Sequence, residues 1–219
     1  MKELGESNTD KRVKLYKAFA GLIPGGSFIA ELGIDKIPEQ RLDRVIDFVE
    51  KLESRIKKLE TKSFTSDQQF GYLAENSLLE SAKAYSAKRR SWLAAICVPL
   101  RDPPYLEEWE LRISSVAKLA SLSDAEVDYL LGYADPTRSF RLRHRQEDRH
   151  VFISDADNRK LPSQELFEKT LLNTEKVIHR DSLLRLGLLN FKDDGSFETY
   201  ELTNSGKLFI YILTGNMVR

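Results

Sequence analysis

The chain has 219 residues, enough for one large domain or two small ones, and 41% of them are hydrophobic, enough to bury real cores. The charges of its 34 basic and 34 acidic side chains cancel. A net charge of zero argues against a protein that coats nucleic acid generally, but it is compatible with a local basic patch. The single cysteine, Cys97, excludes a disulfide within the chain, and with three histidines it cannot make a Cys/His zinc cluster. The first residues, MKELGESNTDKRVK, lack a signal-peptide pattern. We therefore expect a cytoplasmic protein that needs no metal or other cofactor.

The first apolar segment covers residues 18–30, AFAGLIPGGSFIA. Pro24, Gly25 and Gly26 interrupt it, so the pattern predicts a helix, a break and a second helix with Ser27 as its N-cap. A membrane-spanning helix needs roughly 20 apolar residues, so we expect no integral membrane insertion. A buried helical hairpin is the favoured interpretation, and a tip that inserts shallowly into a membrane is the alternative.

Residues 37–62 predict a long helix with an apolar seam. The seam residues follow one another at steps of three and four, a heptad spacing held for more than two heptads. Ile46 and Phe48 widen the apolar face, which favours packing inside a helical domain. The alternative is a dimer, whose seam would consist of Leu42, Val45, Val49, Leu52, Ile56 and Leu59.

Capping residues and breaks mark four further helices. Two lie in residues 63–100, a double proline follows them, and the third covers about 105–122. The fourth begins with a Ser-x-x-Glu pattern, which is a capping box. The expected N-caps are Ser66 or Asp67, then Ser86, and finally Ser123, which is paired with Glu126.

Residues 137–162 form a long polar segment that is rich in arginine and is expected to be partly extended. Arginine binds phosphate in a bidentate manner, and Phe140 can stack on a base. Because Glu147 and Asp148 interrupt the positive charge, a solvated loop with local ion pairs is the favoured interpretation, and nucleic-acid binding is the alternative. The nucleic-acid-binding residues predicted here are Arg138, Arg141, Arg143 and Arg145.

The C-terminal part predicts helices from a cap at Ser163 to the region of Gly187, followed by a hairpin and a closing helix. The strands NFK and ETYELT pair across DDGS, an Asp-Gly turn signal. Asn204 is the expected N-cap of the closing helix. This arrangement resembles a winged helix over about residues 122–212, with the arginine-rich segment 137–162 as an insertion.

A wider set of sequence segments is similar to the abortive-infection alpha type of bacterial proteins. These segments are LAENSLLESAKAYSAKRRSWLAAICV, VAKLASLSDAEVDYLLGY and LLRLGLL with YELTNSGKLF, so the resemblance covers roughly residues 72–213. The resemblance implies a helical N-terminal part, a winged-helix-like C-terminal part and a role in phage defence. No catalytic residue set comes with it.

The recognition helix of a winged helix presents donors to DNA. Here Lys176 and Arg180 are the predicted nucleic-acid-binding residues, and His179 and Arg185 are further candidates for exposed donors. The wing adds Lys192 but also four carboxylates, which repel phosphate. Structural use or protein contact is therefore favoured for this winged helix, and DNA binding is the alternative.

No HExxH, GxSxG or Walker pattern is present, and Cys97 lies on an apolar helix face, so we predict that the protein is not an enzyme. The predicted fold is mainly α, with a helical domain at 1–104 and a winged-helix domain at 105–219. We expect a non-enzymatic phage-defence protein that acts through a protein partner or self-association, with nucleic-acid sensing as an added capacity. The alternative is a winged-helix DNA-binding transcription regulator, dimerised by its N-terminal helix.

Overall fold

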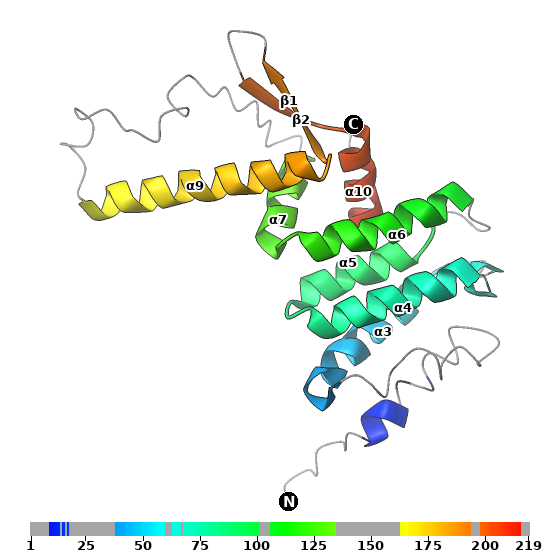
Figure 1. Cartoon of the computed structure of the whole chain (residues 1–219). Coiled ribbons are helices and arrows are strands. Elements are labelled where there is room, and N and C mark those ends of the chain that lie inside the picture. Colours follow the sequence, from blue (N-terminus) through cyan, green and yellow to red (C-terminus); the bar gives the residue numbers. More distant parts are fainter. Residues whose placement is uncertain are drawn as a thin grey trace, which may run out of the picture. The chain divides into compact units, whose positions relative to one another are not determined.

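The computed structural model describes residues 9–13, 15, 17, 38–59, 63–66, 68–100, 106–134, 163–193 and 198–215 (Figure 1). Over these ranges the chain is mainly helical, with a small two-stranded antiparallel sheet near the C-terminus. It divides into two compact units, Met1–Ser121 with Ile212–Thr214 and Leu122–Tyr211 with Gly215–Arg219. In this division the main boundary lies after Ser121, whereas the sequence predicted domains at 1–104 and 105–219. The expected apolar hairpin at 18–30 lies outside the described residues.

The first unit is a stack of helices that pack against their neighbours in the chain. α3 packs on α4 and α5, and α6 packs on the same two helices. Short 3-10 turns precede α3 and α4. The elements are η2 (Glu39–Arg41), α3 (Leu42–Ile56), η3 (Ser63–Ser66), α4 (Gln68–Lys83), α5 (Ala87–Cys97) and α6 (Leu106–Ser121).

The heptad stripe of α3 forms the centre of this unit. Leu42, Val45, Val49, Leu52 and Ile56 are all at most 3% exposed, and Phe48 is buried with them. Leu59 lies beyond the end of the helix and is partly exposed. Because α4 and α5 of the same chain cover the stripe, packing within the chain is confirmed for these side chains. The alternative, in which these five residues form a dimer seam, is therefore wrong, since a second copy could reach them only if the unit opened.

Two predicted helix caps are confirmed. The Ser86 Oγ accepts a hydrogen bond of 2.9 Å from the Arg89 N–H at the start of α5. Ser123 and Glu126 form the capping box of α7 (Asp124–Gly132): the Ser123 Oγ accepts from the Glu126 N–H at 3.2 Å, and the Glu126 carboxylate accepts from the Ser123 N–H at 2.6 Å. These local bonds fix where both helices begin. The predicted cap Asp67 lies outside the described residues.

The second unit contains α7, α9 (Ser163–Arg185), β1 (Leu189–Asp193), β2 (Glu198–Leu202) and, up to Tyr211, α10 (Asn204–Thr214). α9 is one continuous helix, where the sequence predicted more than one. The reason is that the segment contains neither proline nor glycine, and its Asn and Thr residues weaken a helix only mildly. The predicted end near Gly187 is confirmed, since this glycine has a φ of 67°.

β1 and β2 form the predicted hairpin, which confirms the pairing of the two strands. Leu189 pairs with Leu202, and Phe191 pairs with Tyr200. The rings of Phe191 and Tyr200 have centroids 5.4 Å apart, a cross-strand aromatic contact that stabilises such a ribbon.

α10 begins in close contact with the turn that follows α9. Its N-cap is Thr203 and not Asn204: the Thr203 Oγ1 accepts from the Gly206 N–H at 2.9 Å and donates to the Gly187 carbonyl at 2.7 Å. The Thr203 N–H donates to the Leu188 carbonyl at 3.1 Å. A Cβ on Gly206 would lie only 2.1 Å from this Leu188 oxygen. The approach of α10 to the chain at Leu188 therefore requires a glycine at position 206.

We expect Gly206→Ala to destabilise the second unit by about 1–3 kcal/mol, the usual cost of an added group that forces backbone to shift. Alanine is otherwise the better helix former by about 1 kcal/mol, so a helix without this contact would gain stability. Thermal unfolding followed by circular dichroism measures the effect, with Lys207→Ala in the same helix as control. An unfolding temperature at or above that of the wild type would show that the contact is not required.

Candidate functional sites

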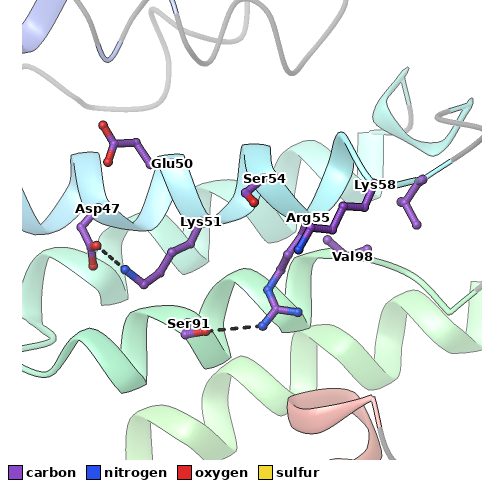
Figure 2. Close-up of a pocket in the computed structure, with 9 residues that line it drawn as sticks. Asp47, Glu50, Lys51, Ser54, Arg55, Lys58, Ser91 and Val98 are labelled. Atoms are coloured by element: carbon purple, nitrogen blue, oxygen red, sulfur yellow. Dashed lines mark hydrogen bonds and ion pairs between the residues drawn. The ribbon is translucent and has the colours of Figure 1, made fainter.

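A polar groove runs along α3 where this helix faces α5 (Figure 2). One wall is the polar side of α3 from Asp47 onward together with Lys58 and Leu59 just after the helix, and the other includes Ser91 on α5 and Val98 directly after it. The groove has a volume of about 590 Å³. It lies wholly within the first unit and combines acidic, basic and hydroxyl side chains.

At one end of the groove, the charge of the Asp47 carboxylate is balanced by neighbouring cations. This carboxylate forms ion pairs with Lys51 and, at 2.5 Å, with the Arg90 Nε. Arg90 also donates to the Ala84 and Tyr85 carbonyls, at 2.8 and 3.0 Å. Burial raises the pKa of Asp47, but the hydrogen bonds from Lys51 and Arg90 outweigh it and leave the pKa below its ordinary value. The ionised carboxylate thus ties the α4–α5 connection to α3, which is a structural role.

Arg55 and Lys58 give the other end of the groove a positive charge. The Arg55 Nη2 donates to the Ser91 Oγ at 3.4 Å, and Figure 2 shows this side chain reaching from α3 across to α5. Over the described ranges, neither Arg55 nor Lys58 forms an ion pair with a carboxylate. The neighbouring Lys57, by contrast, pairs with Glu53 at 2.7 Å. This end has the chemistry of an anion site: two cations beside a hydroxyl group.

The predicted nucleic-acid-binding residues fall into two groups. Arg138, Arg141, Arg143 and Arg145 lie outside the described residues. Of the two on α9, Lys176 is exposed as predicted, but Arg180 is only 8% exposed. The Arg180 guanidinium lies 4.8 Å from the centre of the Tyr200 ring on β2, where it forms a cation–π contact. The prediction that Arg180 is an exposed donor is therefore wrong, because its side chain packs within the second unit.

A cluster of aromatic and polar side chains joins α7 to α9. The Tyr129 ring lies 5.7 Å from the His179 ring and 5.6 Å from that of Tyr133, measured between centroids. Burial raises the pKa of Tyr133, so its phenol stays neutral. Burial raises the pKa of Glu126 too, but hydrogen bonds from Ser182 and Ser123 outweigh it and lower the pKa overall. The cluster explains why His179, a predicted exposed donor, is half-buried.

Among the described residues of the second unit, three large apolar side chains are exposed. Ile178 is 55% and Val177 is 36% exposed on α9, and Phe191 is 41% exposed on β1. Of the basic residues near them, Lys176 and Arg185 are exposed, and Lys192 pairs with Glu201 on the hairpin at 2.5 Å. The outer surface of α9 and the hairpin is thus partly apolar and partly basic.

Cys97 is fully buried, and burial raises the pKa of its thiol to about 12. It therefore stays protonated at neutral pH, which confirms the interpretation of Cys97 as a core residue. No three His, Cys, Asp or Glu side chains gather as a metal-binding group in the part of the chain that the structure describes. Across the same residues, no helix has the length and apolar character to cross a membrane.

The groove is the site that reasoning from the sequence missed. Lys51, Arg55 and Lys58 follow one another at steps of four and three, so their shared helix face was visible in the sequence. Ser91 and Val98 complete the groove from a distant part of the chain, and only the packing of α3 on α5 brings them there. Comparison of the chain with protein-family models, with curated proteins and with solved structures found no match.

Proposed function

We propose that the protein is a non-enzymatic, cytoplasmic protein of the bacterial phage-defence type, which acts by contacting another protein through its second unit. In this proposal α7, α9, the hairpin and α10 form a winged helix that is used for protein contact. The order of these elements and the resemblance of the sequence support it.

The observation that carries the proposal is the kind of side chain that the unit exposes. Ile178 and Phe191 are exposed on α9 and β1, whereas Arg180 is packed against Tyr200. Exposed aromatic and aliphatic side chains are typical anchors of protein interfaces. A DNA-reading surface would instead present basic groups to phosphate.

The second candidate is a DNA-binding regulator. The exposed basic residues Lys176 and Arg185 on α9 favour it. Two observations weigh against it: the Lys192 ammonium pairs with Glu201, and the α3 stripe proposed for dimerisation is buried. Nucleic-acid sensing, where it occurs, is proposed to use Arg138, Arg141, Arg143 and Arg145.

Phage plating on bacteria that express the protein tests the proposal. The wild type should reduce plating efficiency, and the Ile178→Ser, Phe191→Ser variant should lose this protection while keeping its circular dichroism spectrum. Lys176→Ala, Arg185→Ala is the matched basic control and should keep it. If instead the basic variant loses both protection and binding to a short DNA duplex, the regulator is correct. If the wild type does not protect, the phage-defence assignment fails.

A further inference from the structure

We propose that the groove between α3 and α5 binds a small molecule that carries a phosphate group, held at the end formed by Arg55, Lys58 and Ser91. The charge at this end of the groove supports the proposal. Several cations around these helices are paired with carboxylates, among them Lys11, Lys51, Lys57, Lys83, Arg90 and Arg112. Arg55 and Lys58 lack such a pair in the described ranges, and both line one groove. Two like charges in one groove repel each other, and a bound anion would relieve that repulsion.

The hydrogen-bond donors at this end of the groove also suit an anion. The hydrogen bond from the Arg55 Nη2 to the Ser91 Oγ is 3.4 Å long, at the weak limit for such a bond, so a better acceptor would readily replace it. A guanidinium can donate two parallel hydrogen bonds to phosphate oxygens, and an ammonium adds a point charge. The Ser91 hydroxyl can donate to a third oxygen.

The size and lining of the groove indicate the kind of ligand. A volume of about 590 Å³ suits a small molecule, because such sites usually measure roughly 300–1,000 Å³. Leu59 and Val98 add apolar surface to the groove for the organic part of the ligand. Asp47 and Glu50 line the same groove, which therefore lacks the continuous positive charge that a groove for a nucleic-acid strand presents. These features favour a compact phosphate monoester over a nucleic-acid strand.

Arg55 and Lys58 also lie near the C-terminus of α3, where positive charge offsets the helix dipole. That role alone would affect the stability of the protein and would not create a ligand site. Lys57 occupies the same helix end and shares that role, but it does not line the groove. It is therefore the matched control residue.

Nuclear magnetic resonance titration of the full chain with phenyl phosphate tests the proposal, at constant ionic strength. Saturable shifts are expected at the amides of Ser91 and Val98 and at the Arg55 side chain. Arg55→Gln and Lys58→Gln should each weaken binding about tenfold, the effect of one lost charge-assisted hydrogen bond. Lys57→Gln should leave the affinity unchanged. Phenol should bind much more weakly than phenyl phosphate, because it lacks the anion.

Several results would overturn the proposal. One is the absence of saturable shifts up to about 10 mM phenyl phosphate, a concentration that detects even weak binding. Another is equal weakening by Lys57→Gln, which would mean that only the general field of the helix end attracts the anion. Shifts confined to other parts of the chain would place the ligand elsewhere. Tight binding of single-stranded DNA through Arg55 would replace the small ligand with a polyanion.

Discussion

Leu52→Glu is expected to unfold the first unit. Leu52 is 0% exposed on the face of α3 that α4 and α5 cover. An unpaired carboxylate in such a place costs several kcal/mol, a large part of the 5–15 kcal/mol that typically holds a folded domain together. We expect loss of most of the helical circular dichroism signal of α3 to α6, or a sharply lower unfolding temperature. Ile56→Glu, at the end of the same stripe, should act in the same direction.

Ser54→Glu is the control for this experiment, because it places the same side chain on the exposed side of the same helix. It should leave the fold intact. Light scattering on the same samples reports the number of chains in each particle. A Leu52→Glu variant that stays folded while a wild-type dimer becomes a monomer would restore the dimer seam and contradict the packing within the chain.

Arg112→Met is expected to cost about 3–5 kcal/mol, the usual effect of removing one partner of a buried ion pair. Arg112 is 0% exposed, and its Nε lies 3.0 Å from the Glu108 carboxylate. Its Nη1 donates to the carbonyls of Ile96 and Ala95 at 2.7 and 3.3 Å, where α5 ends. Without it, Glu108 loses its buried cation and the last carbonyls of α5 lose their donor.

Denaturant unfolding measured by tryptophan fluorescence reports this loss selectively, since Trp92 and Trp109 are both buried in the first unit and are the only two tryptophans of the chain. The double variant Arg112→Met, Glu108→Gln should recover part of the stability, because no charge is then left without a partner. A single variant as stable as the wild type would show that the pair contributes nothing. Full stability in Glu108→Gln alone would assign the effect to the α5 carbonyls.

The sequence predicted those features that depend on neighbouring residues. Residues within a few positions of one another set the capping box of Ser123 and Glu126, the cap at Ser86, the end of α9 near Gly187 and the strand pairing of the hairpin. Such interactions are independent of the rest of the fold. For the same reason, the Asp-Gly signal was enough to predict the hairpin.

The errors arose where the environment of a side chain depends on distant elements. Arg180 resembles an exposed basic residue in the sequence, but β2 places the Tyr200 ring against its guanidinium. Thr203 and Asn204 are both good capping residues, and the position of Leu188 and Gly187 decides between them. The heptad of α3 is compatible with either a second copy or α5, and periodicity alone does not distinguish the two.

The packing of α7 on α9 has a consequence for how the chain folds. Among the described helices α3 to α6 of the first unit, the main packed pairs are neighbouring helices or helices with one helix between them, so short closures suffice and rapid folding is expected. α7 ends at Gly132 and α9 begins at Ser163, so their pairing must close a longer stretch of chain. The entropy of closure grows only with the logarithm of length, about 0.6 kcal/mol for each doubling. Insertions between these helices should therefore slow the folding of the second unit slightly, deletions should speed it slightly, and both should leave its stability almost unchanged.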